Sequence, residues 1–347
     1  IVKSGSWIFG LSAADRMRIV KGIPSRQTPL AVWEVVRESL LHRRIFKVNP
    51  LLGYMHMSLA FGWFLLIVVG WIETVAYLGF RYVPLHGHVF FKYFATELPH
   101  KPVFDFLMDL LLLFVLSGVT LAFGKRIYSQ AMGMHRTTRH VLGDRIALSV
   151  LWLIFPARLL AESITCALHG GGGFLTGTIG EWMAHHVNPI VLQTLYEPLW
   201  WAYSICLGLF FIVLPFSRYM HIFTEIPLIF LRRYKLHSTE KEGSFDRFQT
   251  DACSRCGICI DPCQLQSELG IDDVQSVYFL RDRRYNHLRQ SVANNCLMCG
   301  RCAEKCPVGI DLNTLRVNSR DKMHNVPDER RYGYFKGLDR SEGAGKV

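Results

Sequence analysis

Eight of the ten cysteines lie in one C-terminal stretch, as two runs with the same spacing. In each run two residues separate the first three cysteines from one another, and three residues precede the fourth. Three thiolates on such a tight turn can bind one cubane cluster, whereas the fourth points away and serves a second cluster. The spacing therefore predicts two [4Fe–4S] clusters with exchanged fourth ligands. One cluster is assigned Cys253, Cys256, Cys259 and Cys306, and the other Cys296, Cys299, Cys302 and Cys263.

The same cysteines have an alternative interpretation as structural zinc sites. Zinc takes four ligands, usually as two separated pairs, and two complete four-cysteine runs in tandem fit that pattern poorly. Gly257 and Gly300 follow the second cysteine of each run, where a small residue lets backbone amides approach the sulfurs. The first run departs from the usual pattern because Cys263 is followed by Gln264 instead of proline. That departure removes no ligand.

Two histidines are candidates for a different metal centre. His56 lies near the start of the first long apolar stretch, and His221 lies just beyond the fourth. If both chain termini are on the same side of a membrane, the two imidazoles lie at the same depth and can take both axial positions of a b-type haem. A histidine near a helix end also commonly extends its polar tip to the membrane surface, and periodicity alone leaves that alternative open.

Charged residues within the apolar stretches predict a third site. Arg158 and Glu162 are four residues apart in the third stretch, and Asp109 lies in the second. Ionisable groups inside a membrane are expensive, so they are usually paired or functional. One interpretation is a quinone pocket whose carboxylate relays protons, with His185 and His186 as weaker candidates for the same role. The alternative is a structural ion pair of Arg158 with Glu162 or Asp109.

These residues belong to a chain that is unusually apolar for its charge. Half of the 347 residues are hydrophobic, the mean hydropathy is +0.19 and the net charge is +11. Four stretches reach the roughly 20 residues that a membrane-spanning helix needs. They run from about Gly53 to Phe80, Val103 to Phe123, Ile146 to Leu168 and Leu195 to Phe216. Lys and Arg are nearly absent within them, which disfavours buried helices of a soluble domain, and nothing indicates nucleic-acid binding.

The basic residues predict the orientation of these stretches. Arg and Lys are abundant before the first stretch, between the second and third, and after the fourth, but absent between the third and fourth. The positive-inside rule therefore places both termini and the cysteine runs on the cytoplasmic side of a cell inner membrane. The N-terminal region shows no cleavable signal peptide. Its segment from Leu30 to Phe46 is amphipathic, which suits either the membrane interface or a solvated position on the cysteine-rich domain.

The predicted fold is mainly α-helical, with a four-helix transmembrane bundle followed by a C-terminal helical ferredoxin domain. The expected parts are a basic amphipathic segment, the transmembrane domain, a linker, the ferredoxin domain and a tail. Their limits are 1–52, 53–235, 236–251, 252–321 and 322–347.

Three segments resemble known redox proteins. Residues 214–223, LPFSRYMHIF, resemble the end of the last helix of the respiratory nitrate reductase gamma subunit, where the histidine ligates a haem. The segment from Arg43 to His56 resembles the start of the first haem-bearing helix of membrane iron–sulfur oxidoreductases related to heterodisulfide reductase. The cysteine runs, their long spacer and residues 307–311 are similar to the helical dicluster ferredoxin domain of heterodisulfide reductase and anaerobic glycerol-3-phosphate dehydrogenase.

The resemblance implies a cytochrome b domain over 53–235, with haem b on His56 and His221. In the nitrate reductase family a second haem has ligands at the positions of Leu66 and Tyr203 here, and neither residue can serve as the usual ligand. The resemblance therefore implies one haem, although outer-side histidines leave a second one open. These histidines are His86, His88, His100, His169, His185 and His186.

Together these features predict an electron-transfer subunit of a respiratory complex. Electrons would pass between a quinone, with menaquinone expected, haem b, the two clusters and a soluble redox partner. The resemblance suggests a CCG-type iron–sulfur protein or a flavoprotein as that partner. The chain has no nucleotide fingerprint, Walker loop or hydrolytic triad, so substrate chemistry is expected on another subunit. A haem-free membrane anchor and a redox sensor are the alternatives.

Overall fold

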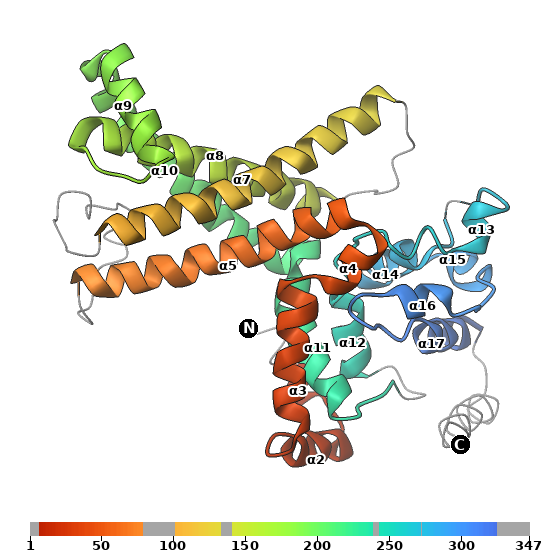
Figure 1. Cartoon of the computed structure of the whole chain (residues 1–347). Helices are drawn as coiled ribbons and strands as arrows, with labels where there is room; N and C mark the ends of the chain where they lie inside the picture. Colours follow the sequence, from red (N-terminus) through yellow and green to blue (C-terminus); the bar gives the residue numbers. More distant parts are fainter. Residues whose placement is uncertain (1–6, 79–100, 133–140, 239–242, 272, 325–347) are drawn as a thin grey trace. The chain divides into compact units, whose positions relative to one another are not determined.

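The computed structural model of the chain describes residues 7–78, 101–132, 141–238, 243–271 and 273–324. Within these residues all regular elements are helical, which confirms the predicted fold class (Figure 1). The described chain divides into two compact units. The span unit contains the described residues from Asn49 to Ser217, and the cluster unit contains those from Trp7 to Val48 and from Arg218 to His324.

Four long helices form the span unit, and all four are apolar and long enough to cross a membrane. They are α5 (Pro50–Leu78), α7 (Lys101–Ala131), α8 (Leu142–His169) and α10 (Pro189–Val213), the last continued by a short 3-10 turn at Leu214–Phe216. The apolar spans within them are Pro50–Ala76, Lys101–Tyr128, Leu142–His169 and Pro189–Phe216. The prediction of four helices long and apolar enough to cross a membrane is confirmed. The expected end of the first one, residues 79–80, lies outside the described residues.

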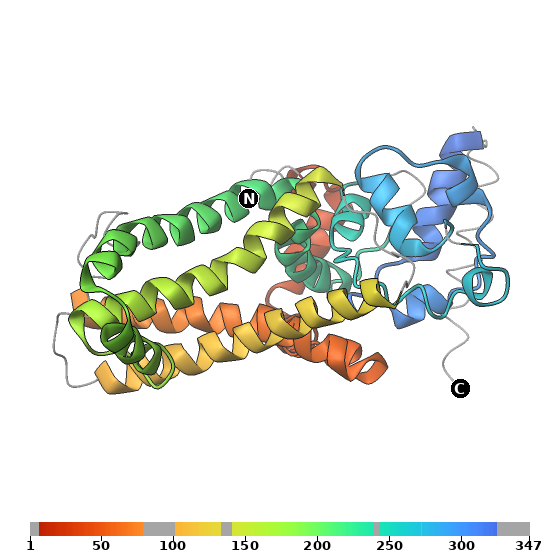
Figure 2. The ribbon, with the colours of Figure 1, turned by 90° about the horizontal axis from the view of Figure 1, so that it is seen from above.

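The span helices pack as two neighbouring pairs. Helix α5 packs against α7, and α8 packs against α10 and the short helix α9 (Thr176–His186), an arrangement visible in Figure 2. The ring of Trp63 on α5 joins the pairs, because it lies 5.7 Å from the ring of Phe155 and 5.1 Å from that of Phe210. Large apolar side chains such as Ile67 and Ile205 point outward and are exposed, which suits helices surrounded by lipid.

The cluster unit is built from shorter helices. They are α2 (Ala13–Gly22), α3 (Gln27–Glu34), a π-helical segment (Val35–Leu40), α4 (Arg43–Val48), a 3-10 turn (Arg218–Met220), α11 (His221–Arg233), α12 (Ser244–Asp251), α13 (Gln264–Ser267), α14 (Ser276–Arg284), α15 (Gln290–Asn294), α16 (Arg301–Lys305) and α17 (Leu312–His324). Helix α11 contacts α3, the π-helical segment and α12, while α17 contacts α15 and α16. Helix α11 therefore connects the N-terminal helices to the cysteine-rich part of the unit.

The amphipathic segment from Leu30 to Phe46 is not one continuous helix. It is divided into α3, the π-helical segment and α4, with a break at His42, whose φ is +50°. Its inward face carries Glu34 and Glu38, whereas Trp33 is 60% exposed. Both carboxylates are buried with arginine partners, whereas the apolar Trp33 and Leu41 are exposed.

Glu34 is the centre of that buried charge pairing. Its two carboxylate oxygens pair with Arg232 and Arg233 at the end of α11, the Arg233 contact at 2.5 Å. Nearby, Ser39 donates a hydrogen bond of 2.8 Å to Glu225 on α11. Burial raises the pKa of Glu225 to about 7, and the charge of Glu38 adds to the rise while Ser39 and Arg232 oppose it.

Replacement of Glu225 tests how the burial of its carboxyl group affects the stability of the protein. The unfolded chain ionises Glu225 near pH 4.5, whereas the folded chain keeps its proton until about pH 7. The folded state therefore binds more protons in that window, so the wild type loses stability as the pH rises through it. Above pH 7 we expect Glu225→Gln to be more stable than the wild type by up to about 3 kcal/mol, with no such advantage below pH 4.5. Thermal unfolding in detergent across this range checks the prediction; a pH-independent difference would contradict it.

Asp109 on α7 caps the start of α9. Its Oδ2 accepts hydrogen bonds from the backbone amides of Leu175 and Thr176 at 2.7 and 2.9 Å, and its Oδ1 accepts one from the Thr176 hydroxyl at 2.8 Å. This buried carboxylate, with its three hydrogen-bond donors, fixes the start of α9 to α7. Asp109 is thus a structural residue of the span unit, whatever further role it has.

The cap predicts a difference between two substitutions of Asp109. Asp109→Ala should lower stability by about 1–2 kcal/mol because three donors lose their acceptor. Asp109→Asn should retain most of the stability, since its amide oxygen still accepts the backbone amides and its amide nitrogen can donate to Thr176. Thermal unfolding of the purified protein in detergent distinguishes the two. Equal destabilisation by both substitutions would show that the charge of Asp109 matters more than its hydrogen bonds.

Candidate metal centres

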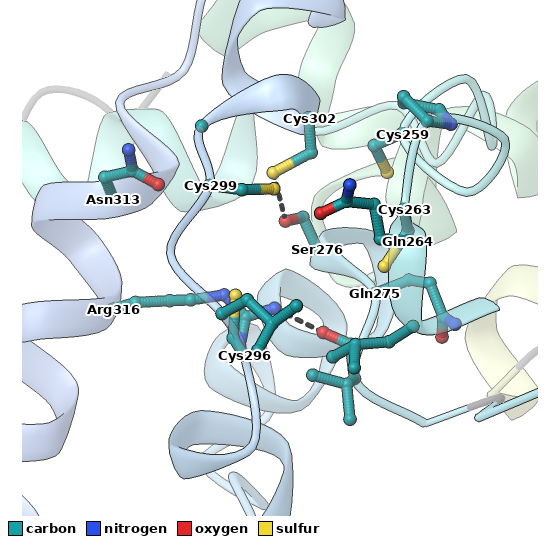
Figure 3. Close-up of a pocket in the computed structure, with 15 residues that line it drawn as sticks. Cys259, Cys263, Gln264, Gln275, Ser276, Cys296, Cys299, Cys302, Asn313 and Arg316 are labelled. Carbon is teal, nitrogen blue, oxygen red and sulfur yellow. Dashed lines mark hydrogen bonds between the residues drawn. The ribbon is translucent and has the colours of Figure 1, made fainter. Parts of the chain in front are cut away.

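Two cavities in the cluster unit bring the eight cysteines together. One, here called the outer cavity, is lined by Cys263, Cys296, Cys299 and Cys302 (Figure 3). The other, the inner cavity, is lined by Cys253, Cys256, Cys259 and Cys306. Each cavity thus gathers the four thiols that the spacing assigned to one cluster, with Cys259 also reaching the outer cavity. The fourth cysteine of each run lies with the other run.

The two runs adopt the same backbone turn. Arg255 and Gly257 in the first run have φ values of +58° and +84°, and Met298 and Gly300 at the equivalent positions of the second have +55° and +77°. Residues with positive φ bend the chain sharply, and glycine adopts this conformation without steric cost. The repeated turn directs successive thiols of each run into one cavity.

An arginine fixes the loop that leads into each run. Arg284 donates hydrogen bonds of 2.6–3.1 Å to three carbonyls between the last turn of α12 and Cys253. Arg320 donates bonds of 2.7–2.9 Å to three carbonyls between the end of α15 and Cys296. Sequence reasoning missed both arginines, because their acceptors are backbone carbonyls that carry no residue-type signal. The only sequence hint is the density of arginine around and after the cysteine runs.

The electrostatics of the cavities fit iron–sulfur clusters. Burial raises the pKa of Cys256 to about 12, and that of Cys259 lies well above its ordinary value for the same reason. Four thiolates in such surroundings need a compensating positive charge, which the iron atoms of a cluster supply. The outer cavity also has donors to sulfur: Ser276 donates to Cys302 Sγ at 3.1 Å, and the Met298 amide to Cys296 Sγ at 3.4 Å.

The cavities differ in their access to solvent. At the outer cavity Cys299 is exposed and the neighbouring Leu297 is 61% exposed. Buried apolar side chains such as Val277, Leu280 and Val308 surround the inner cavity. A cluster in the outer cavity would therefore lie closer to the surface than one in the inner cavity.

Helix α11 is bound directly to the loop after Cys306. Arg232 Nη1 donates to the carbonyls of Val308 and Gly309 at 2.8 and 3.3 Å, and Arg44 donates to the carbonyl of Pro307 at 3.1 Å. Gly309 has a φ of +71°, and a Cβ at this position would overlap the Arg232 guanidinium. Only glycine at this position therefore allows the loop to lie so close to the end of α11.

The two predicted haem ligands lie in different units. His56 lies on α5 in the span unit, and His221 begins α11 in the cluster unit. Their Nδ1 atoms donate to the backbone carbonyls of Leu52 and Arg218 at 3.0 and 2.8 Å. This tautomer places the ring's lone pair on Nε2, which is the usual arrangement in a metal-bound histidine. Both residues therefore have the chemistry of an axial ligand, and their pairing around one haem stays a prediction.

The structure places the predicted quinone residues in separate contacts. Arg158 and Glu162 form a buried ion pair on α8, with Arg158 Nε and Nη2 at 2.9 and 2.7 Å from Glu162 Oε1. Among the described residues Asp109 has its hydrogen bonds with Leu175 and Thr176, at the start of α9. His185 and His186 are exposed at the end of α9. The quinone role of all five residues stays a prediction.

Two further residues, which sequence reasoning did not connect with the ion pair, interact electrostatically with Arg158. They are Glu73 on α5 and Tyr203 on α10, so three of the long helices contribute to this buried polar group. Tyr203 thus lies beside a buried arginine. Of the remaining histidines that were candidates for a second haem, His169 packs on Tyr196 with ring centroids 5.9 Å apart. Outside the described residues lie His86, His88 and His100.

Comparison with known proteins identifies the cysteine-rich part. Residues 249–310 match the family described as the 4Fe-4S dicluster domain. No curated protein and no solved structure matches the chain. The match includes both cysteine runs and therefore favours iron–sulfur clusters over zinc. The chain thus combines a 4Fe-4S dicluster domain, which indicates an electron-transfer role, with four helices apolar enough to cross a membrane.

The grouping of the cysteines predicts which substitutions affect the same cluster. One electron paramagnetic resonance signal of the reduced protein should change in both Cys263→Ser and Cys296→Ser. The other signal should change in both Cys306→Ser and Cys253→Ser. Loss of one whole cluster should remove roughly half of the iron. Cys206→Ser in α10 is the control and should change neither signal. If Cys263→Ser instead altered the signal that depends on Cys253, the exchanged assignment would be wrong.

Proposed function

We propose that this chain is a membrane-bound electron-transfer subunit of a respiratory oxidoreductase complex. It would pass electrons between a quinone, a b-type haem, two [4Fe–4S] clusters and a soluble redox partner. The observation that carries the proposal is the presence of a dicluster domain and four membrane-spanning helices on one chain. Helices in the bilayer can reach a lipid-soluble carrier such as menaquinone, and the dicluster domain can reach a soluble protein.

Helix α11 supports the proposed order of the redox centres. It begins at His221, the proposed haem ligand, and near its other end Arg232 contacts the loop after Cys306. With the ideal rise of a helix, these two residues are about 17 Å apart along the axis. One rigid element therefore joins a proposed haem ligand to the inner cavity. The proposed order is haem, inner-cavity cluster and outer-cavity cluster.

The exposed edge of the outer cavity supports electron exchange with a partner there. Cys299 and Leu297 are exposed, so a docked protein can approach the outer-cavity cluster closely. The proposed partner is a soluble subunit with its own redox centre, either a CCG-type iron–sulfur protein or a flavoprotein. The distribution of basic residues supports a position of this domain on the cytoplasmic side of the inner membrane.

The proposed quinone site involves the charged residues of the spans. Reduction of a quinone takes up protons together with electrons, so a carboxylate near the ring is chemically useful. Glu162, held by Arg158, and Asp109 are the proposed groups, with His185 and His186 as further candidates. Both carboxylates also have structural contacts, so their substitution has to be interpreted together with the stability of the protein.

Optical spectroscopy tests the haem and separates the relay from a haem-free anchor. The purified protein should show a reduced b-type haem band, and either His56→Ala or His221→Ala should abolish it, because loss of one axial ligand removes the bis-histidine coordination. His237→Ala is the matched control: this histidine is exposed in the cluster unit, and its loss should leave the band unchanged. A wild-type protein with iron–sulfur signals and no haem band would leave only the anchor function.

A further inference from the structure

A buried arginine outside the matched dicluster region reaches into the outer cavity. Arg316 lies on α17, six residues beyond the end of the matched segment, and only 1% of it is exposed. Its side chain lines the outer cavity together with four cysteines assigned to one cluster, as Figure 3 shows. An arginine is rarely buried to this extent unless its charge is compensated.

Hydrogen bonds hold the guanidinium in one orientation. Nη1 donates to the carbonyl of Val292 at 2.6 Å, and Nη2 donates to the carbonyl of Val274 at 2.5 Å. The guanidinium also lies over the ring of Phe279, 4.4 Å from its centroid. Among the described residues Arg316 Nε is buried and has no hydrogen-bond partner. A buried donor of this kind calls for an acceptor that protein atoms do not supply.

The charges that surround Arg316 identify the kind of acceptor. Arg316 shares the lining of the outer cavity with Cys263, Cys296, Cys299 and Cys302, and no carboxylate is among the described residues that line it. The cation therefore faces the four thiols assigned to the outer-cavity cluster, where thiolates and inorganic sulfides would provide both negative charge and acceptors.

We propose that Arg316 is a positioning residue that raises the reduction potential of the outer-cavity cluster, through its charge and its Nε–H bond to cluster sulfur. This inference rests on the proposed function. When the cluster accepts one electron no covalent bond changes, but its negative charge increases. A fixed cation and a hydrogen-bond donor stabilise the more negative, reduced form more than the oxidised form. Ser276, which donates to Cys302 Sγ, acts in the same direction from another element.

Redox titration of the full-length protein in detergent, followed by electron paramagnetic resonance, tests this role. In Arg316→Met one of the two cluster potentials should fall, with at least a tenfold change in the reduced-to-oxidised ratio at fixed potential, about 59 mV for one electron. The other cluster potential should stay unchanged. Arg316→Lys should cause a smaller fall, because the charge is kept and the Nε donor is lost.

Arg320→Met is the matched control for a purely structural effect. Arg320 also binds the carbonyl of Cys296 but does not line the cavity, so its loss should lower thermal stability and shift that potential by less than Arg316→Met does. Unchanged potentials in an Arg316→Met protein with full iron content would overturn the inference, as would an equal shift in Arg320→Met. If Arg316→Met fails to retain its clusters, Arg316→Lys is measured instead. A selective fall of one cluster potential in that variant supports the inference, and unchanged potentials overturn it. A wild-type protein without [4Fe–4S] signals would instead refute the proposed function.

Discussion

The negative charge that four thiolates would bring to each cavity is the constraint on which the arrangement of the cluster unit depends. Arginines contribute in two ways: Arg284 and Arg320 fix the segments before the cysteine runs through backbone carbonyls, and Arg316 brings its charge into the outer cavity. Hydroxyl and amide donors, such as Ser276, reach individual sulfurs. These arginines around the cysteine runs thus have defined positions and partners that the net charge alone does not reveal.

Features with local causes could be predicted from the sequence. Four apolar stretches became four spans, and the spacing of two cysteine runs corresponds to the grouping of thiols around two cavities. Contacts between distant segments could not be predicted in the same way. The cap of α9 by Asp109, the pairing of Glu34 with α11 and the position of Arg316 join residues far apart in sequence. The acceptors are often backbone carbonyls, which every residue type provides.

In the amphipathic N-terminal segment, ion pairs with arginines decide which side chains are buried. Trp33 marks its apolar face, which in an isolated helix would be the face to bury. Glu34 and Glu38 are buried instead, because arginines of the same unit compensate their charge. An outward Trp33 suits a helix that lies against lipid.

The pairing of Glu34 with Arg232 also has a consequence for biogenesis. These residues are 198 positions apart, and all four spans are synthesised between them. The ribosome therefore releases Glu34 long before its partner exists, and the carboxylate stays hydrated until the last span has emerged. Since Arg232 also holds the loop after Cys306, the pairing links the segment before the four long helices to the edge of the inner cavity after them.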